Sequence, residues 1–495
     1  MPTDSTPLKI LIASSEVAPL AKTGGLADVT AALAAELNRR KHDVRLVMPL
    51  YPRVTEGGRK LRRVRGLQGL KVELGPHRFT FSVLATRLPG SRQDVWCLEC
   101  PPLYDRQGIY TQDDDEHLRF AFLSRAVLAL CQASNWAPDI LHCNDWHLGL
   151  APLYLKLLSS WERLFQGTRT VLTIHNIGYQ GIFPASEVGH LGLDDAAHLL
   201  HQEDLAAGRI NFMKTGLLYA DVLTTVSRTY AREIQTPEYG MGLDELLRGR
   251  ADHLVGIVNG VDYDEWSPEK DPRLPVNYSA RKPEGKLECK RALLTGLGLP
   301  FAEGALTFGI VSRLVGQKGF ELLFETLPEL LGHHDARLVV LGSGESRFES
   351  FFAGLQQAFP RKVCYYNGYN DKLAHLIEAG ADAFLMPSRY EPCGLNQMYS
   401  LKYGTVPIVR RTGGLADTVQ TFDRQTGEGT GIVFEHFDAE AMRRALRYAL
   451  ELWHDPPAWR RMMQNGMAMD FSWRRQAGLY EELYHRLLGR VPGRA

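Results

Sequence analysis

The feature that most constrains the fold of this chain is an alternation of short, apolar, β-rich runs with longer amphipathic stretches, which occurs twice. Residues 8–14 (LKILIAS) form such a run, and residues 26–40 (LADVTAALAAELNRR) follow with helical spacing. This order is typical of a parallel sheet with helices on both faces. The further strands predicted for the first sheet are residues 43–49, 139–143, 170–175, 222–227 and 254–259.

A proline-rich segment interrupts the alternation and indicates two domains. Residues 264–285 carry many charges and few apolar side chains, which is typical of a linker or a surface crossing. With 495 residues, the chain is also too long for one ordinary core. We therefore expect an α/β fold of two Rossmann-like domains, residues 1–255 and 256–470, facing each other across a deep cleft. A last helix within 471–495 could belong to either domain. The strands predicted after the linker are residues 305–313, 336–344, 362–369, 381–388 and 405–411.

Composition limits the classes of function. Lys+Arg and Asp+Glu both number 57, so the formal net charge is +0. The lack of surplus positive charge argues against a nucleic-acid partner. No apolar run reaches the roughly 18 residues that a membrane span needs, and the N-terminus lacks the pattern of a signal peptide. The 7 cysteines are scattered, so we expect a reduced, cytoplasmic protein with no membrane partner.

Three stretches suggest metal or nucleic-acid binding, and none is interpreted that way. Cys97 and Cys100 have C-x-x-C spacing but lack the second pair that a zinc site needs. His142 and His147 lie five residues apart, without a neighbouring cluster of Cys or His. The basic run at residues 59–65 alternates with apolar residues, and we expect a solvated strand or loop there.

The sequence TGGLAD occurs at residues 23–28 and again at 412–417, each time after a basic residue. Each copy is predicted to follow a strand and to open a helix. Glycine permits a sharp turn and close approach of a ligand, and the first N–H groups of a helix lack internal partners. Because ligands of open parallel sheets bind beyond the carboxyl ends of the strands, we expect one such turn on each wall of a cleft. Neither copy is G-x-G-x-x-G, so dinucleotide binding is not indicated.

Two cations and a carboxylate stand out in the second predicted domain. Arg313 and Lys318 lie between a strand and a helix, where both side chains can reach a group at the strand's tip. A planar guanidinium and a point charge suit a diphosphate, and fixed cations stabilise charge that grows as a diphosphate leaves. Glu391 lies just before the helix predicted at 395–403 and could either cap that helix or hold sugar hydroxyls. Cys393 is predicted to be a small buried hydrophobe rather than a nucleophile.

With these residues in hand, the chain resembles the bacterial glycogen synthases and their plant relatives, the starch synthases. The motifs that carry the resemblance extend over nearly the whole chain in the family's order, and together they are highly specific. They are KTGGLADV (22–29), HCNDWH (142–147), HNIGYQG (175–181), NGVD (259–262), SRLVGQKG (312–319), SRYEPCGL (388–395) and RTGGLADTV (411–419).

The resemblance implies a retaining glucosyltransferase of the GT-B type. Its donor would be ADP-glucose, its partner an α-1,4-glucan, and it would require no metal or other cofactor. Arg313 and Lys318 would hold the diphosphate, and Glu391 the glucosyl hydroxyls, with Cys393 beside it. The remaining implied contacts are Lys22 and Gly25 to the donor, Asp145 and His175 on the sugar and acceptor side, Asn259 at the domain junction, Gly414 and Leu415 through backbone N–H groups, Tyr369 on adenine, and Tyr104 along the donor cleft.

The mechanism stays open at this stage. Retention usually suggests a carboxylate nucleophile, and Asp145 is the only motif carboxylate of the first domain that we consider for it. We favour same-face transfer, in which the acceptor hydroxyl arrives on the side from which the diphosphate departs. His175 would then be a ligand for the sugar 6-hydroxyl rather than a base. Many members of the wider superfamily carry a second glutamate eight positions after the first. This chain has Tyr399 there, so a two-glutamate mechanism cannot be assumed.

Three rival functions remain. A UDP-sugar-dependent transferase would share the scaffold, but the motifs at 175–181 and 388–395 argue against it. A phosphorylase would bind pyridoxal phosphate. A non-catalytic glucan-binding protein would not need Lys22, Arg313, Lys318 and Glu391, and the presence of all four argues against it.

Overall fold

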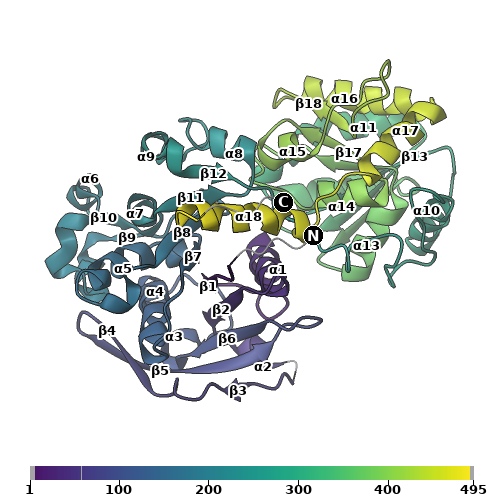
Figure 1. The fold of residues 1–495 in the computed structure, drawn as a ribbon. Helices are drawn as coiled ribbons and strands as arrows, with labels where there is room; N and C mark the ends of the chain where they lie inside the picture. Colours follow the sequence, from purple (N-terminus) through teal and green to yellow (C-terminus); the bar gives the residue numbers. More distant parts are fainter. Residues whose placement is uncertain (1–5, 57, 491–495) are drawn as a thin grey trace. The chain divides into compact units, whose positions relative to one another are not determined.

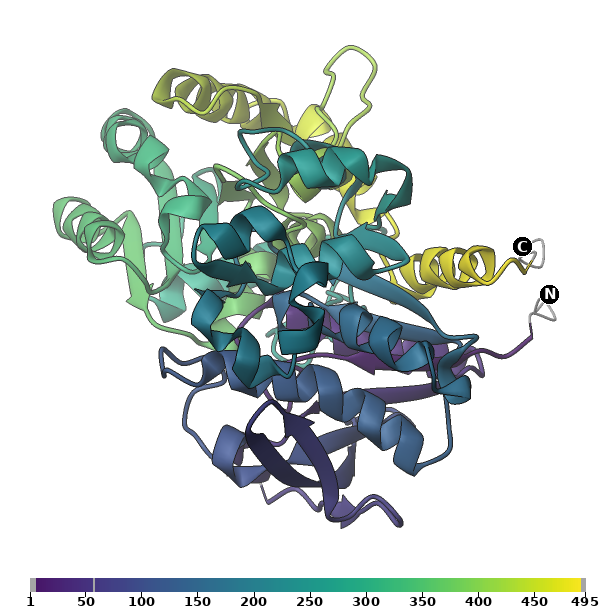
Figure 2. The same ribbon diagram turned by 90° about the vertical axis from the view of Figure 1, so that its left-hand side faces the viewer.

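The computed structural model describes residues 6–56 and 58–490, which divide into two compact units. The first comprises residues 6–56, residues 58–226, Ala231–Gly260 and residues 473–490. The second comprises Ser227–Tyr230 and Val261–Ser472. Figures 1 and 2 show in each unit a sheet with helices packed on it. This is the mixed α/β architecture with parallel sheets that the alternating sequence pattern predicts.

The first unit is built on a mostly parallel sheet with the strand order β12-β11-β8-β7-β1-β2-β6-β5-β3. In its parallel part the strand order reverses between β1 and β7, which are hydrogen-bonded parallel neighbours. An antiparallel edge of β3, β4 and β5 extends it. The sequence pattern did not predict β4, β5 or the parallel strand β6. The bounds are β1 Lys9–Ala13, β2 Asp43–Pro49, β3 Arg62–Arg63, β4 Leu70–Leu74, β5 His77–Arg87, β6 Asp94–Glu99, β7 Ile140–Asn144, β8 Arg169–Ile174, β11 Val222–Thr225 and β12 Leu254–Gly256; β9 Ile182–Pro184 and β10 Arg209–Asn211 form a separate pair.

Helices cover this sheet. They are α1 Gly25–Arg39, α2 Pro52–Glu56, α3 Pro101–Tyr104, α4 Glu116–Ala133, α5 Ala151–Ser159, α6 Gln202–Ala206, α7 Phe212–Tyr219, α9 Asp244–Gly249 and α18 Trp473–Leu487, with α8 Arg228–Glu233 at the division between the units. The last helix, α18, lies beside α1 (Figure 1). Arg40 holds Glu481 of α18 at 2.7 Å, and His142 of β7 contacts the Tyr484 hydroxyl at 2.7 Å. The C-terminal helix is therefore integrated into the first unit.

The second unit contains a six-stranded sheet in the order β15-β14-β13-β16-β17-β18, with every pairing parallel. This is the doubly wound order 3-2-1-4-5-6, which reverses between β13 and β16. The strand β14 is buried along its entire length, as expected for a sheet covered on both faces. The bounds are β13 Leu306–Val311, β14 Ala336–Gly342, β15 Val363–Asn367, β16 Ala383–Met386, β17 Val406–Arg410 and β18 Ile432–Phe434.

Three helices of the second unit, α13, α16 and α17, begin with a side-chain cap. The side chain of Asn370 accepts a hydrogen bond from the N–H of Leu373 at α13, and Asp438 accepts one from Ala441 at α16. The bounds are α10 Gly285–Gly296, α11 Leu323–His333, α12 Ser346–Ala358, α13 Asp371–Gly380, α14 Asn396–Tyr403, α15 Gly413–Thr418, α16 Ala439–Trp453 and α17 Pro456–Met467.

The proline-rich segment 264–285 is anchored to the second unit. Its Asp271 is fully buried and accepts hydrogen bonds from Tyr403 and His375, each at 2.7 Å. Burial raises the pKa of Asp271, but these two hydrogen bonds outweigh it and hold the pKa below its usual value. The segment is thus a packed crossing rather than a free linker.

Among the described residues, no helix combines the length and the apolar character needed to cross a membrane. In the basic run at 59–65, Arg62 and Arg63 form the exposed strand β3, in agreement with the expected solvated strand.

Candidate functional site

The first unit gathers polar side chains where the strand order of its sheet reverses. Asn144 ends β7, and its side-chain amide donates to the carbonyl oxygen of Ala13, the last residue of β1, at 3.0 Å. This bond joins the carboxyl ends of the two strands at the reversal, the place where open α/β sheets bind ligands. Asp145 and His175 follow β7 and β8 at the same edge.

Asp145 is held in a strained, buried position. Its backbone φ is 55°, a left-handed conformation that is uncommon outside glycine. One carboxylate oxygen accepts the backbone N–H of His175 at 2.7 Å. Burial raises the pKa of Asp145 to about 7, although hydrogen bonds from the backbone of His175 and Asn176 oppose the shift. This carboxyl group orients the start of the segment HNIGYQG.

His175 is kept neutral, and its hydrogen bond identifies the tautomer. Burial, reinforced by His142, lowers the pKa of His175 to about 3. Its Nε2 lies 2.9 Å from Asn144 Oδ1, and the amide nitrogen of Asn144 is engaged with the Ala13 carbonyl. Nε2 must therefore carry the proton and donate it to Oδ1, which leaves the lone pair on Nδ1. A neutral imidazole with an accepting Nδ1 can receive a hydrogen bond from a hydroxyl group.

The first TGGLAD turn opens helix α1 at Gly25, as predicted, but a buried carboxylate occupies part of it. Glu16 accepts hydrogen bonds from the backbone N–H groups of Thr23 and Gly24, and from the Thr23 hydroxyl at 2.6 Å. The Tyr110 hydroxyl donates at 2.5 Å to Oε1, the oxygen that also accepts the Thr23 hydroxyl. The sequence analysis missed Glu16, and its only signal was an acidic residue directly after the first strand.

Lys22 stands exposed before this turn and pairs with Asp28 of α1 at 2.8 Å. Burial raises the pKa of Asp28, and Lys22 opposes the shift. Since Lys22 is half exposed, this ion pair can open at small cost when an anionic ligand competes for the lysine.

The two histidines of HCNDWH have structural partners. His142 is fully enclosed, and its ring nitrogens contact the Tyr484 hydroxyl at 2.7 Å and the Thr173 hydroxyl at 2.6 Å. Both nitrogens are thus engaged, which leaves neither for a metal ion. His147 stacks on Tyr110 with ring centroids 4.8 Å apart.

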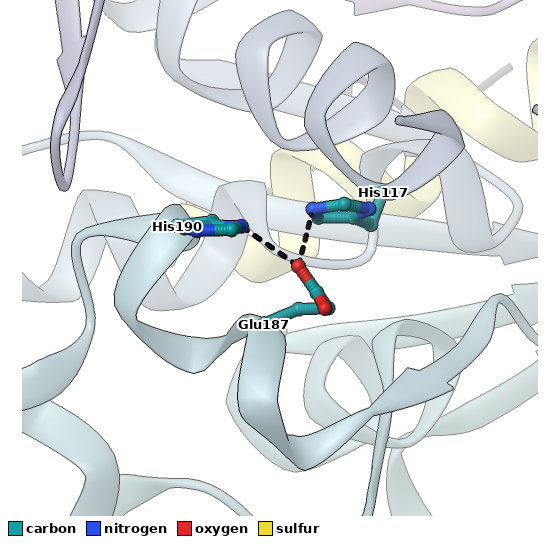
Figure 3. Close-up of side chains that lie close together, drawn as sticks. All are labelled: His117, Glu187 and His190. Atoms are coloured by element: carbon teal, nitrogen blue, oxygen red, sulfur yellow. Dashed lines mark hydrogen bonds and ion pairs between the residues drawn. The ribbon is translucent and has the colours of Figure 1, made fainter. Parts of the chain in front are cut away.

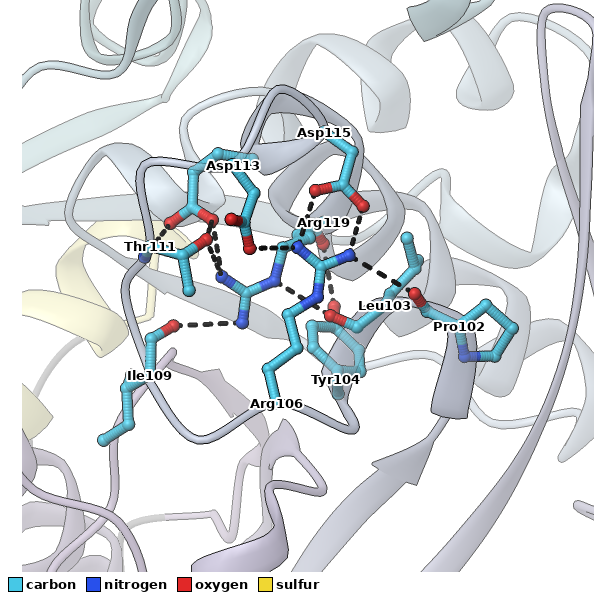
Figure 4. A network of polar contacts seen from close by, with 10 residues as sticks. Pro102, Leu103, Tyr104, Arg106, Ile109, Thr111, Asp113, Asp115 and Arg119 are labelled. Carbon is cyan, nitrogen blue, oxygen red and sulfur yellow. Dashed lines mark hydrogen bonds and ion pairs between the residues drawn. The ribbon is translucent and has the colours of Figure 1, made fainter.

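Tyr104 lies in the core, contrary to the expectation that it lines a cleft. It is 0% exposed, and its hydroxyl donates to the carbonyl oxygen of Arg119 at 2.7 Å. Figure 4 shows Arg119 and Arg106 surrounded by acceptors from α3 and from the loop that follows it. Tyr104 is buried because it ends helix α3 next to α4, where its hydroxyl contacts the backbone of Arg119. Tyr104 therefore offers no surface to a donor molecule.

Asn259 lies at the end of the first unit and is buried. Its side-chain oxygen Oδ1 has no hydrogen-bond partner among the described residues. A buried acceptor without a partner is costly unless water or a ligand supplies one. Asn259 therefore keeps an acceptor atom that a ligand or water can satisfy.

In the second unit, the predicted cations and carboxylate surround the reversal between β13 and β16. Lys318 follows β13, and its Nζ lies 2.6 Å from Glu391 Oε2 in the loop after β16. The Ser388 hydroxyl donates to the same oxygen at 3.1 Å. Arg313 is exposed, and no ion pair to it is found within residues 6–56 and 58–490. The guanidinium of Arg313 is thus accessible near the end of β13. Lys318, which is paired with Glu391, comes after the same strand.

The second TGGLAD turn opens α15 directly after β17, as predicted. Gly413 has φ +43°, and a Cβ there would lie 1.9 Å from the carbonyl oxygen of Glu391, so only glycine fits. The turn is therefore packed tightly against the 391–393 loop, and Cys393 beside it is buried as expected.

The predicted use of Gly414 and Leu415 does not agree with this geometry. The Gly414 N–H donates to the Glu391 carbonyl at 3.0 Å, and the Leu415 N–H donates to the Thr412 carbonyl at 3.0 Å. Both backbone donors already have partners, because the turn closes on itself and on the neighbouring loop. We therefore assign them to shaping the loop that carries Glu391 rather than to direct diphosphate binding.

Two tyrosines of this unit differ sharply in environment. Tyr369 follows β15 and is 76% exposed, with its hydroxyl 3.2 Å from Asp371 Oδ1, so its ring is accessible to a planar base. Tyr399 stacks face to face on Trp266, with ring centroids 3.9 Å apart. The position at which many relatives carry a second glutamate is therefore part of an aromatic stack.

Two profiles of known families match the chain in succession. "Starch synthase catalytic domain" matches residues 9–249, and "Glycosyl transferases group 1" matches residues 298–468. Among solved structures, the catalytic domain of Arabidopsis thaliana starch synthase IV, bound to ADP and acarbose, has a TM-score of 0.89 and 35% identity, covering 98% of this chain and 100% of that one. A Thermosynechococcus elongatus sucrose-phosphate synthase has a TM-score of 0.59 at 18% identity, covering 97% and 99%, and supports the fold alone.

Each unit has a parallel sheet with a polar cluster at the carboxyl ends of the strands, where the strand order reverses. Together with these matches, this arrangement defines the class of protein, a glycosyltransferase of the GT-B type. Glycogen synthases from Thioalkalivibrio sulfidiphilus and Geobacter sulfurreducens are 47% and 44% identical to the chain. They cover 97% and 98% of it, at 100% and 97% of their own lengths. The chain belongs to the glycogen synthase family.

Proposed function

We propose that this enzyme transfers glucose from ADP-glucose to the non-reducing 4-hydroxyl end of an α-1,4-glucan, with retention of configuration and release of ADP. The observation that carries the proposal is the cluster of Arg313, Lys318 and Glu391 at the strand reversal of a doubly wound sheet. The relative that holds ADP and acarbose supports the same pair of ligands for this chain.

The second unit would bind the nucleotide sugar. An exposed Arg313 and a Lys318 that already faces a carboxylate can together neutralise a diphosphate, and Tyr369 offers an exposed ring for adenine. Glu391 accepts two hydrogen bonds, from Lys318 and Ser388. When Lys318 turns to the diphosphate, this carboxylate becomes free to accept hydroxyls of the glucosyl ring.

The first unit would bind the acceptor and contribute Lys22 to the donor. His175 acts through its accepting Nδ1 as a ligand for a sugar hydroxyl, because a histidine whose pKa is about 3 holds no proton to give at neutral pH. Asp145 is a positioning residue, since its carboxyl group binds the backbone of His175. A carboxyl engaged in this way is poorly suited to attack an anomeric carbon.

This arrangement favours same-face transfer. As the bond from the anomeric carbon to the diphosphate oxygen breaks, negative charge grows on the diphosphate, and Arg313 and Lys318 stabilise it. The acceptor 4-hydroxyl forms the new bond on the same face and passes its proton to the leaving oxygen. No enzyme carboxylate is bonded to the sugar at any step.

The reaction would need no metal ion or other cofactor, since these side-chain cations carry the neutralising charge. We therefore expect EDTA to leave the initial rate unchanged. The enzyme would work in the cytoplasm. All seven cysteines lie in the described part of the chain and none forms a disulfide, as expected for a reducing compartment.

The discriminating experiment compares donors and products. With glycogen as acceptor, we expect kcat/KM for ADP-glucose to exceed that for UDP-glucose. We expect the added glucose to be released by a hydrolase specific for α-1,4 bonds. A preference for UDP-glucose, or transfer only to small acceptors, would support a different transferase on this scaffold.

A further inference from the structure

A cluster of two imidazoles and one carboxylate lies in the first unit, in residues that the proposed glucosyl transfer does not use. His117 belongs to the first turn of α4, and Glu187 and His190 lie one turn apart on the short helix Ala185–Leu191. Figure 3 shows both rings directed at the same carboxylate. His117 Nε2 is 3.0 Å from Glu187 Oε2, and His190 Nδ1 is 2.7 Å from that oxygen.

The contact between His117 and Glu187 is close but is not a hydrogen bond. His117 Nε2 is buried and has no hydrogen-bond partner among the described residues. The hydrogen bond of this ring goes to the backbone of Asp114 instead. A ring nitrogen that donates to a backbone carbonyl leaves the lone pair on the other nitrogen, the arrangement found in metal-binding histidines. In the neutral ring, an unprotonated Nε2 then lies 3.0 Å from a carboxylate oxygen with no proton to join the two atoms, and a cation bound to both would satisfy them.

The donor atoms have the spacing that a small metal ion requires. One atom from each of His117, Glu187 and His190 lies within 4.8 Å of the others. Zinc binds nitrogen and carboxylate oxygen at about 2.0–2.2 Å in a tetrahedron, which puts neighbouring ligand atoms about 3.3 Å apart. The observed separations of 2.7 and 3.0 Å need only a slight opening. The side chain of His190 is 45% exposed, which provides a path for the ion.

A neighbouring ring supports the orientation of His190. His77 packs edge-on against it, with ring centroids 4.9 Å apart. On the other side, Phe183 contacts the His117 ring at 5.8 Å between centroids. The two ligand rings are thus positioned by packing before any ion binds, which lowers the ordering cost of binding.

We propose that His117, Glu187 and His190 form a binding site for a divalent transition-metal ion of the zinc type, with water in the fourth position. Two imidazoles and a carboxylate are a ligand set typical of Zn²⁺ and Co²⁺ rather than of Mg²⁺ or Ca²⁺, which take mainly oxygen ligands. The ion ties the beginning of α4 to the helix Ala185–Leu191. It takes no part in glucosyl transfer.

The test is a titration of the metal-free full-length enzyme with CoCl₂, monitored by visible absorption. ZnCl₂ is then added to displace the bound Co²⁺. We expect one equivalent of Co²⁺ to give the intense bands of a tetrahedral site, and Zn²⁺ to abolish them. Glu187→Gln and His190→Ala should each weaken the affinity by more than about 100-fold. His198→Ala is the matched control, because His198 is an exposed histidine just after this helix, and it should change nothing.

A second measurement guards against variants that bind metal elsewhere or fold poorly. One equivalent of ZnCl₂ should raise the Tm of the wild-type protein by several degrees and leave that of Glu187→Gln unchanged. Absence of the Co²⁺ bands, or bands and a Tm shift equal in the wild type and in both ligand variants, would overturn the proposal. The cluster would then be an ion pair only.

Discussion

The replacement of Lys318 by alanine separates two roles that the structure assigns to one side chain. Lys318 Nζ contacts Glu391 Oε2 at 2.6 Å, and the side chains of Lys318 and Glu391 are 19% and 7% exposed. In the resting protein the lysine neutralises a nearly buried carboxylate. In the proposed reaction it neutralises the departing diphosphate. The substitution should therefore reduce both stability and turnover.

The losses of stability and of turnover differ in size. Removing one partner of a buried ion pair costs about 3–5 kcal/mol, and partial exposure of Lys318 reduces this to about 2 kcal/mol. That corresponds to a fall in Tm of roughly 4–8 °C. Removing one group that stabilises transition-state charge lowers kcat by about 10²–10³-fold. Because Arg313 remains in place, we expect the lower end, about 100-fold.

The double variant Lys318→Ala/Glu391→Gln distinguishes the roles. Neutralising Glu391 removes the unpaired charge, so the Tm should recover most of its loss while kcat stays low. Lys282→Ala, at an exposed lysine of the same unit, should alter neither quantity. Thermal unfolding and ADP release at saturating ADP-glucose provide the two readouts, and glycogen binding should stay within about twofold throughout. If kcat recovers together with the Tm, or if glycogen binding falls as far as kcat, the assignment of Lys318 to the leaving group is wrong.

Three further predictions follow from buried groups of the first unit. Asp145 has a folded-state pKa of about 7, above its unfolded value. Its ionisation therefore disfavours folding increasingly as the pH rises from about 4 to 7, by on the order of 4 kcal/mol in all. Urea unfolding should show that the stability of Asp145→Asn relative to the wild type is greater at pH 8 than at pH 5, and a pH-independent difference would contradict the assignment. His175 has a pKa of about 3 and should not affect the shape of the pH–rate profile between pH 5 and 8. His175→Ala should therefore lower kcat without moving either limb of that profile. Loss of an inflection near pH 6.5 in this variant would show instead that His175 titrates during catalysis. Tyr104→Phe should lower stability by about 1–3 kcal/mol, because the Arg119 carbonyl loses its buried donor, while leaving the KM for ADP-glucose unchanged; a raised KM at wild-type stability would return Tyr104 to the donor site.

The sequence predicted the sheets because a buried parallel strand is encoded locally. The run LTFGIV in β13 and the run ARLVVLG in β14 are apolar along nearly their whole length, and this pattern depends little on distant residues. The same holds for the helices that begin at Gly25 and Asn396, within one residue of prediction. The antiparallel strands β4 and β5 were missed because their buried residues alternate with exposed or half-exposed ones and form no continuous apolar run.

The side-chain arrangement of the site depended on contacts that no local pattern contains. Glu16 meets Tyr110 across 94 positions, and Lys318 meets Glu391 across 73. The pairing of Lys318 with Glu391 follows from the strand order, which brings the ends of β13 and β16 together. Tyr104 was expected in the donor cleft only from the family resemblance, and nothing in the neighbouring sequence showed that its hydroxyl would donate to the Arg119 carbonyl. The sequence thus named candidate residues, and their side-chain partners became visible only in the structure.

The central claim is that this chain transfers glucose from ADP-glucose to a glucan. The most direct test measures ADP release from ADP-glucose with and without glycogen, together with the incorporation of labelled glucose into the glycogen. We predict ADP release that depends on glycogen and equals the incorporation of glucose mole for mole. Glycogen binding without ADP release, or ADP release that is indifferent to glycogen, would contradict the claim.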